Sequence, residues 1–215
     1  MSEVKEQSDY FANHEVAVKW PFTIYHNPIE ENVQLYLQKI AQRSESLPTA
    51  LNLGCGWFGS YPQLKSLAHW SACDLDPRCV DVVHQRYPEV DAFTCKPVPE
   101  LSPGSYDVII AKEVIEHVLN PRQWVQALIH GLKPGGHLLL STPNYGISLL
   151  PFVEYTILEL IARRQGFSRF DIHPTKFTGK RLKTLLEDAC PEGSQIHIRK
   201  LSLGMVLFAD AELPK

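Results

Sequence analysis

The residues of this chain best suited to chemistry are a glycine turn and the acidic residue that follows it. Gly54, Gly56 and Gly59 come directly after the apolar run at residues 50–53, and Asp74 closes a second short apolar run. A buried strand that ends in glycines lets backbone N–H groups approach a ligand closely. A carboxylate at the end of the next strand can accept hydrogen bonds from both hydroxyls of a ribose. The pattern predicts a site for a nucleoside-containing cofactor.

Two acidic residues follow the second apolar run, and their sequence contexts differ. Asp74 comes directly after residues 70–73, whereas Asp76 precedes Pro77. An aspartate before a proline is typical of a helix N-cap with proline in the first turn. We therefore assign the ribose position to Asp74 and predict that Asp76 caps the following helix.

A second group of titratable side chains follows the apolar run at residues 106–111. Lys112, Glu113 and His117 come next in the chain. Ligands of open α/β sheets sit outside the carboxyl ends of the strands, so this group is placed to meet a substrate. His117 is the leading candidate for a general base, and a helix beginning at Glu113 would put both residues on a related face. A packing or capping role for His117 stays an equal alternative.

Strands and helices must position these residues, and the chain alternates between the two. The apolar patterns predict strands at 50–53, 70–74, 90–94, 106–111 and 137–142, and helices at 28–42, near 60–68, and at 77–86, 121–130 and 178–189. Such alternation predicts a parallel sheet covered by helices on both faces. Residues 131–136, which include Lys133, are expected to end a helix and return the chain to the sheet. Two apolar runs joined through Gly204, 195–203 and 205–209, predict an antiparallel hairpin at the sheet edge.

Composition restricts the class of protein. The 215 residues, 44% of them hydrophobic, can bury one sizeable core, so a single domain is expected over 1–215. A net charge of -3 provides no basic face for a polyanion, which argues against nucleic acid as a partner. The five cysteines lack a C-x-x-C pair, which supports neither a disulfide framework nor a zinc site and suits a reducing, cytoplasmic compartment. We expect neither a signal peptide in residues 1–20 nor a membrane-spanning run.

In this order, the motifs resemble those of the class I S-adenosylmethionine-dependent methyltransferases. They are most similar to the small-molecule branch that includes the ubiquinone-biosynthesis O-methyltransferases. The most specific matches are LNLGCG at 51–56, Asp74, EVIEHV at 113–118, LKPGG at 132–136 and STPN at 141–144, with a weaker one at 173–178. The resemblance covers about residues 48–144. It implies an α/β, Rossmann-like doubly wound sheet of seven strands, mostly parallel with an antiparallel C-terminal hairpin strand, and helices on both faces.

The resemblance also implies a cofactor and its site. S-adenosylmethionine would lie across the glycine turn with its ribose on Asp74, and S-adenosylhomocysteine would be the product. Cys95 and Lys96 would flank the adenine, while the glycines, Ala111 and Lys112 would lie on the methionine side. No metal ion is implied. The complete cofactor-binding set is Asn52, Gly54, Cys55, Gly56, Asp74, Leu75, Cys95, Lys96, Ala111 and Lys112.

Several positions depart from the family pattern. Asn52 and Cys95 stand where relatives usually carry acidic residues, and the third glycine is displaced to Gly59, which leaves Trp57 and Phe58 in the turn. These differences keep open a non-catalytic binding or scaffold protein with the same fold. An NAD-dependent oxidoreductase is a further alternative, because Gly-x-Gly-x-x-Gly followed by an acid also suits a dinucleotide. The Tyr-x-x-x-Lys pair that such an enzyme could use occurs only inside the first helix after the turn.

Methyl transfer is an in-line displacement, so the protein must chiefly align a small acceptor and exclude water. Contacts with the acceptor are expected from outside the shared core, from Trp20, Tyr25 and His26 and from Tyr145. These aromatic side chains suit an aromatic or hydrophobic acceptor, with O-methylation favoured. His173 is a weaker catalytic candidate, because the following proline marks a turn.

The expected organisation has four parts. They are an N-terminal helical segment at 1–45, the cofactor-binding core at 46–144, an apolar cap or substrate insertion at 145–177, and the C-terminal helix and hairpin at 178–215. Within the cap, residues 149–164 could instead make weak peripheral contact with a membrane or contact a partner protein. The identity of the acceptor and the oligomeric state are not encoded in any motif.

Overall fold

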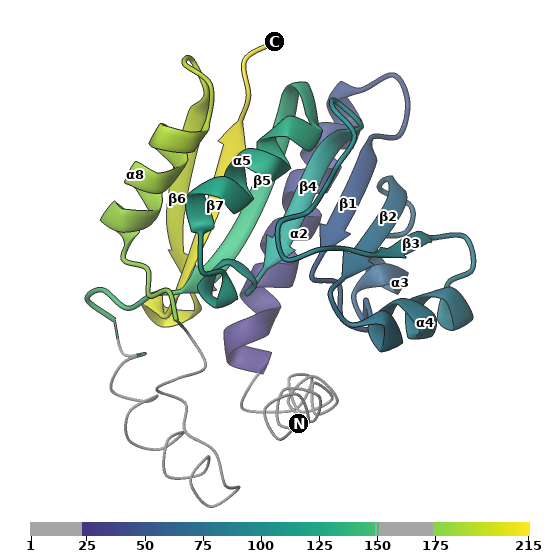
Figure 1. Cartoon of the computed structure of the whole chain (residues 1–215), viewed down its shortest axis with the longest axis horizontal. Helices are drawn as coiled ribbons and strands as arrows, with labels where there is room; N and C mark the ends of the chain where they lie inside the picture. The colour runs from purple at the N-terminus through teal and green to yellow at the C-terminus, as the bar shows by residue number, and fades with distance from the viewer. Residues whose placement is uncertain (1–22, 149, 151–173) are drawn as a thin grey trace, which may run out of the picture.

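Seven strands form one sheet, which is the central layer of the computed structural model (Figure 1). The structure describes residues 23–148, 150 and 174–215. The strand order is β3-β2-β1-β4-β5-β7-β6, and β7 is the strand that runs antiparallel to its neighbours. The strands are β1 Thr49–Leu53, β2 His69–Asp74, β3 Asp91–Thr94, β4 Tyr106–Lys112, β5 Leu132–Pro143, β6 Gln195–Leu201 and β7 Val206–Glu212. This arrangement confirms the predicted doubly wound α/β fold.

Helices cover both faces of the sheet (Figure 1). One face carries α2, α3 and α4, and the other carries α5 and α8. The helices are α2 Thr23–Arg43, α3 Tyr61–Leu64, α4 Pro77–Arg86, α5 Pro121–Gly131 and α8 Gly179–Ala189. In α8 the buried residues Leu182 and Leu186 are four positions apart, which places both on the side that faces the sheet.

The central strand β1 contributes to both layers of the core. Ala50 belongs to the cluster on the α2 side, whereas Leu51 and Leu53 belong to the cluster on the α5 side. Because neighbouring side chains of a strand point to opposite faces, a strand covered on both sides is apolar at nearly every position. This explains why residues 50–53 are apolar at every position except Asn52.

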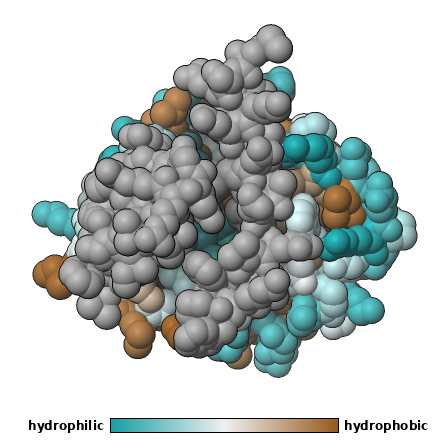
Figure 2. Space-filling model, turned by 90° about the horizontal axis from the view of Figure 1, so that it is seen from below, coloured by the Kyte–Doolittle hydropathy of each residue, from teal (hydrophilic) through white to brown (hydrophobic). Residues whose placement is uncertain are grey.

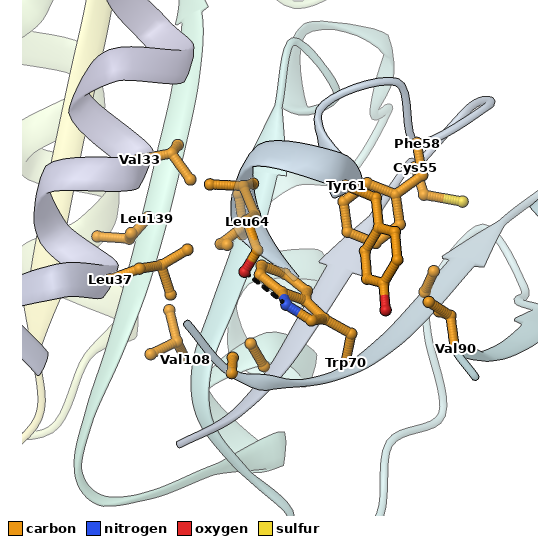
Figure 3. Packing of buried hydrophobic residues seen from close by; sticks show 14 of the residues in the cluster. Val33, Leu37, Cys55, Phe58, Tyr61, Leu64, Trp70, Val90, Val108 and Leu139 are labelled. Atoms are coloured by element: carbon orange, nitrogen blue, oxygen red, sulfur yellow. Dashed lines mark hydrogen bonds between the residues drawn. The ribbon is translucent and has the colours of Figure 1, made fainter. Parts of the chain in front are cut away.

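Aromatic side chains fill the α2-side core below the glycine turn (Figure 3). Phe58 packs edge-on against Trp70, with ring centroids 5.2 Å apart, and it also contacts Tyr61 at 5.3 Å. The buried indole nitrogen of Trp70 donates a hydrogen bond to the carbonyl of Leu64 at 3.1 Å, so its polar atom is satisfied. These contacts tie the turn and α3 to strand β2.

Helix α2 begins earlier than the sequence predicts. The spacing of apolar residues predicts a helix from residue 28, but the helix begins at Thr23. The additional first turn is held by tertiary hydrogen bonds. Ser202 Oγ donates to the carbonyl oxygen of Tyr25 at 2.6 Å, and the Tyr25 hydroxyl donates to Glu113 Oε2 at 2.6 Å. The predicted helix near 60–68 is also wrong in length, since α3 ends at Leu64 and the chain turns back to begin β2.

Strand β5 begins at Leu132 rather than at the predicted residue 137. Leu132 pairs with Tyr106, and the register then shifts before the regular pairing from His137 onward, so the glycines lie in a bulge of the strand. Gly135 takes φ +72 there, and its N–H donates to the carbonyl of Pro214 at 2.9 Å. The preceding helix ends at Gly131 as expected, but the predicted turn is wrong, because residues 132–136 already belong to β5.

Lys133 lies at the amino ends of the strands, away from the glycine turn. Its ammonium pairs with Asp107 Oδ2 at 2.8 Å, and the same carboxylate oxygen accepts from the Thr49 backbone and hydroxyl. Burial opposes ionisation of Asp107, but the hydrogen bonds from Lys133 and Thr49 outweigh it and lower the pKa of this carboxyl. The group joins β1, β4 and β5 where each strand begins or bulges.

Strands β6 and β7 form the predicted antiparallel hairpin at the sheet edge, with β6 outermost. The turn between them, Ser202–Gly204, contains three consecutive residues of positive φ. Viewed from below, the described residues around the outline are mostly hydrophilic, with isolated hydrophobic ones (Figure 2). Within the described ranges, no helix combines the length and the apolar character that crossing a bilayer requires.

Candidate functional site

The glycine turn lies at the carboxyl end of β1 and crosses to β2. The N–H groups of Gly54 and Cys55 both donate to the carbonyl of Cys73, at 2.8 and 3.1 Å. Gly54 has φ +67, and a Cβ there would lie 2.4 Å from Cγ2 of Val114, so only glycine is accommodated. Gly56 has φ +49, and a Cβ there would meet no atom within 4 Å. The space beside Gly56 is therefore open to a ligand that approaches the backbone.

Asp74 ends β2 and faces the turn. Its carboxylate is 9% exposed and accepts from the N–H of Gly56 at 2.9 Å and from the N–H of Asp76 at 3.0 Å. These charge-assisted bonds orient the carboxylate and hold the second glycine of the turn against it. Asp76 accepts from the N–H of Arg78 and is the N-cap of α4, which confirms its predicted structural role.

Phe58, one of the two bulky residues in the turn, does not project into this open space. Phe58 is 2% exposed and is part of the aromatic core under the turn. It takes φ +48, whereas Gly59 does not have a positive φ. The position that needs a left-handed residue is therefore 58, and the displaced glycine at 59 does not supply it. The Arg86 guanidinium at the end of α4 lies 5.7 Å from the ring centroid of Trp57.

A polar group lies on the α2 side of the sheet next to the turn. Lys112, at the end of β4, pairs with Glu30 of α2 at 2.6 Å and donates to Ser60 Oγ at 3.2 Å. Asn52, two residues before the first glycine, is 2% exposed, and its Oδ1 is buried without a hydrogen-bond partner among the described residues. Glu30 Oε2 is also buried without a hydrogen-bond partner among the described residues. Two buried acceptors are thus available for a donor that enters from the turn.

Glu113 follows β4 and connects three elements. Its carboxylate accepts from the hydroxyl of Tyr25 on α2 at 2.6 Å and from Ser141 Oγ on β5 at 2.8 Å. Glu113 has φ +53, a strained conformation for a residue with a side chain, and such strain is typical of functional sites. Burial, followed by the charge and hydrogen bond of Glu113, raises the pKa of Tyr25 well above its usual range. Tyr25 is therefore a permanent hydrogen-bond donor to this carboxylate.

His117 lies in a short 3-10 turn, η2 Ile115–His117. The condition of a helix beginning at Glu113 is not met, because Glu113 is left-handed and precedes this turn. His117 is nevertheless half-buried at the carboxyl end of β4, on the same edge of the sheet as the glycine turn. Beside it Glu116 is 1% exposed, and its carboxylate accepts from the hydroxyl of Thr142 at 3.1 Å.

The residues expected near the adenine are more exposed. Cys95 follows β3 directly, is half-buried, and its N–H donates to the carbonyl of Asp74 at 2.9 Å. Lys96 pairs with Glu100 on the surface at 2.7 Å, and Leu75 is 55% exposed. The remaining predicted position on the methionine side, Ala111, is fully buried in β4 and offers only its backbone.

The residues predicted to contact the acceptor are only partly within the described chain. Tyr25 and His26 lie on the first turn of α2, with their ring centroids 5.0 Å apart. Tyr145 follows β5, its N–H donates to the carbonyl of Phe177 at 2.8 Å, and the Lys176 ammonium lies 5.5 Å from its ring centroid. Trp20, His173 and most of the predicted cap, residues 149 and 151–173, lie outside the described residues.

Two functional features of this site are visible only in three dimensions. One is the link between Tyr25 and Glu113, which are 88 positions apart, and the other is the pair formed by Glu30 and Lys112. Among the described residues, no three His, Cys, Asp or Glu side chains are grouped in a way that could hold a metal ion. The site combines a glycine cradle, an oriented carboxylate and a neighbouring group of polar side chains.

Comparison with known proteins gives a consistent result. A family model described as "Methyltransferase domain" matches residues 25–189. The ubiquinone biosynthesis O-methyltransferase of Paraburkholderia xenovorans is 30% identical over 176 residues, which cover 77% of this chain and 75% of that protein. The enzyme of the same name from Burkholderia vietnamiensis is 30% identical over 141 residues, 60% of this chain and 60% of its own length.

The solved structures agree on the fold. A SAM dependent methyltransferase from Aquifex aeolicus superposes with a TM-score of 0.61 at 14% identity, covering 86% of this chain and 89% of that one. The resemblance to the class I methyltransferases inferred from the motifs is confirmed by these matches.

Proposed function

The chain belongs to the methyltransferase domain family, and we propose that it transfers the methyl group of S-adenosylmethionine to a small acceptor molecule. The observation that carries this proposal is the carboxylate of Asp74, which ends β2 and holds the N–H of Gly56 at 2.9 Å. A carboxylate fixed beside a glycine turn is what the two ribose hydroxyls of an adenosyl cofactor require. The curated relatives named as methyltransferases support the same reaction class.

The described residues fit such a cofactor. The glycines give backbone access, and the buried Oδ1 of Asn52 lacks a partner and can accept from the cofactor's ammonium group. Lys112 supplies a positive charge near the turn for the carboxylate of the cofactor. Asp74 would hold the ribose, and Cys95 would line the adenine. When bound, the cofactor supplies an electrophilic methyl group on a sulfonium sulfur.

Three features of the turn and the preceding strand favour an active site over a non-catalytic scaffold. The Phe58 side chain is buried in the core below the turn and leaves the ligand side open. Asn52 keeps an acceptor oxygen where relatives usually carry an acidic residue, so a hydrogen bond to a donor can be retained without the negative charge. The glycine cradle is intact at Gly54, where a Cβ would collide with Val114.

We further propose that the acceptor is a small aromatic or hydrophobic molecule with a hydroxyl group. The aromatic rings of Tyr25 and His26 lie on α2 beside the carboxyl end of β4, and the curated relatives are named O-methyltransferases. The net charge of -3 gives no support to a nucleic-acid acceptor. All five cysteines are free thiols, which suits a reducing compartment such as the cytoplasm.

His117 is our candidate for the general base that removes the proton of the hydroxyl. Glu113 is less suited to that role, because both of its carboxylate oxygens already accept hydrogen bonds from hydroxyl groups of the protein. We assign Glu113 to positioning α2 against β4 and β5. Replacement of His117 by alanine is expected to slow turnover by about 10²–10⁴-fold and to leave cofactor affinity unchanged.

Calorimetric titration of the purified chain tests the cofactor. S-adenosylmethionine and S-adenosylhomocysteine are expected to bind, and NAD is expected not to bind. Loss of both adenosyl signals would overturn the proposal in favour of a scaffold, and binding of NAD alone would favour an oxidoreductase. Methyl-labelled cofactor incubated with catechols, quinols, other hydroxylated metabolites and free carboxylates then identifies the acceptor class, and label only on carboxylates would refute the hydroxyl acceptor.

A further inference from the structure

Two side-chain oxygens near the glycine turn are buried without a hydrogen-bond partner in the part of the chain that the structure describes. They are Oδ1 of Asn52, on β1, and Oε2 of Glu30, on α2. A buried acceptor that lacks a donor is costly in a folded protein, and each such atom requires an explanation. Both oxygens are therefore candidates to accept from a donor that is not part of the chain.

Lys112 relates the two residues to each other. Ala50 and Ile110 belong to the core cluster on the α2 side, so Asn52 and Lys112, each two positions further along its strand, lie on the same side. Asn52 pairs with Ile110, which makes Lys112 its diagonal neighbour on that face of the sheet. The Lys112 ammonium in turn pairs with Glu30 Oε1 at 2.6 Å. Three elements thus bring polar side chains to one place at the carboxyl ends of β1 and β4.

The carboxylate of Glu30 differs from the other two carboxylates beside the turn. Each oxygen of Asp74 accepts from a backbone N–H, and each oxygen of Glu113 accepts from a hydroxyl group. Glu30 has one oxygen on Lys112 and one without a partner among the described residues. Because Asn52 is neutral, Glu30 is the acceptor of this group that can balance the charge of a cationic donor, and such charge-assisted hydrogen bonds are the strong ones.

The ion pair of Glu30 and Lys112 presents two opposite charges side by side. An α-amino-acid group carries the same two charges, an ammonium and a carboxylate on one carbon atom. The lysine is complementary to the carboxylate, and the two unpartnered oxygens are complementary to the ammonium. Without the charge of Glu30, the ammonium of the ligand would face Lys112 and the neutral Asn52, and the two positive charges would repel each other.

We propose that Glu30, together with Asn52, binds the ammonium group at the amino-acid end of the adenosyl cofactor and thereby selects ligands that carry this end. This role of Glu30 rests on the proposed function, because it concerns one part of the same cofactor. Lys112 remains the partner of the carboxylate. The negative charge that the ammonium requires then comes from helix α2, outside the glycine turn and the strands that hold the rest of the cofactor.

Three adenosyl compounds separate the parts of this recognition. S-adenosylhomocysteine has the ammonium and the carboxylate, its decarboxylated form keeps only the ammonium, and methylthioadenosine has neither. Each is titrated calorimetrically into the full-length chain and into Glu30→Gln, whose side chain has nearly the same shape but no charge. We expect the substitution to weaken binding of S-adenosylhomocysteine by about 10–100-fold, the effect of one charge-assisted hydrogen bond, and to change that of methylthioadenosine by less than about twofold.

The decarboxylated compound distinguishes contact with the ammonium from an indirect effect through Lys112. If Glu30 only orients Lys112 for the carboxylate, a compound without a carboxylate is insensitive to Glu30→Gln. We expect instead that the substitution weakens its binding by about tenfold or more, and that the loss persists in a Lys112→Met background. Unchanged affinity for this compound in both backgrounds would overturn the assignment of Glu30 to the ammonium.

The chain offers a matched control and a rescue. Glu31, the next residue of α2, is exposed, so Glu31→Gln makes the same change in net charge away from the group and should leave all three affinities within about twofold. Asn52→Asp added to Glu30→Gln returns a carboxylate to the neighbouring strand and should recover about tenfold in affinity for S-adenosylhomocysteine. Circular dichroism verifies folding. If Glu30→Gln alone does not fold, the comparison within the Lys112→Met background decides, because no lysine is then left without its partner.

The results distinguish this role of Glu30 from the proposed function. Equal affinity of Glu30→Gln and the unaltered chain for S-adenosylhomocysteine would refute the role of Glu30 and leave the proposed function in place. A loss in Glu31→Gln as large as that in Glu30→Gln would also refute it, since the effect would then be one of net charge. If none of the three compounds binds the unaltered chain, the proposed function is wrong, and the assignment of Glu30 is wrong with it.

Discussion

Replacement of Phe58 tests whether the glycine turn requires a left-handed backbone conformation at position 58, where this chain has an aromatic residue. Phe58 combines φ +48 with a side chain that is 2% exposed and packs against Tyr61 and Trp70. Burial of the ring favours phenylalanine, whereas the backbone conformation favours glycine. Comparison of Phe58→Ala with Phe58→Gly separates the two effects, because both variants lack the ring and only their backbone preferences differ.

The difference in unfolding free energy between the two variants follows from opposing contributions. Loss of a buried phenylalanine side chain costs about 3–5 kcal/mol of unfolding free energy in either variant. At an ordinary position glycine is less stable than alanine by about 0.5–1 kcal/mol. In the left-handed region alanine is penalised by about 1–2 kcal/mol, and glycine is not. We therefore expect Phe58→Gly to be more stable than Phe58→Ala by about 0.5–1 kcal/mol, the reverse of the usual order.

Tyr61 provides the matched control. It is a buried aromatic residue in contact with Phe58, but it lies in α3 and is not among the residues with positive φ. Tyr61→Gly should be less stable than Tyr61→Ala by about 0.5–1 kcal/mol. Urea unfolding followed by circular dichroism gives the unfolding free energy of each of the four variants. If glycine is the less stable choice at both positions, the left-handed requirement at 58 is refuted.

Three further predictions concern the site and its supports. Asp74→Asn should weaken binding of S-adenosylhomocysteine by about 10–100-fold, because an amide accepts with one oxygen only; equal affinity in calorimetry would exclude the ribose role. Glu113→Gln should lower the unfolding free energy by about 1–3 kcal/mol, since one of its two hydroxyl donors loses its acceptor, and a thermal melt that matches the unaltered chain would contradict this. The depressed pKa of Asp107 means that its pairing stabilises the fold above the unfolded pKa of about 3.9 and that this contribution is lost as pH falls through the lower folded pKa. Lys133→Met should therefore reduce stability at neutral pH and flatten its acid dependence below about pH 4, and an unchanged acid unfolding profile would count against the pairing.

Much of the fold follows from local patterns that tertiary contacts do not override. The run at 50–53 is apolar because β1 is covered on both faces, and Asp76 before Pro77 marks the start of α4 at the predicted residue. The errors have physical causes. The apolar spacing indicates a helix only from residue 28, but contacts with Glu113 and Ser202 hold an additional turn before it. The glycines at 135 and 136 suggested a turn, whereas the sheet accommodates them in a bulge of β5.

Part of the candidate site could likewise be predicted from the sequence, and part could not. The glycines and Asp74 could be located from the sequence, because their positions relative to β1 and β2 are fixed by local order along the chain. The link from Tyr25 to Glu113 could not, since a hydrogen bond across 88 positions leaves no periodic signal.

Among related chains, we expect the side chains of helix α2 and those at the end of strand β4 to change together. Tyr25 binds Glu113, and Glu30 binds Lys112, so one helix is attached to two consecutive residues of the site. A chimera that takes residues 23–43 from a relative with different side chains at these positions would remove one hydrogen-bond donor from Glu113 and the ion-pair partner of Lys112. Exchange of the helix together with residues 112 and 113 would avoid this. In related chains, substitutions at these positions are therefore expected to occur in pairs across the two segments, while the glycine turn stays the same.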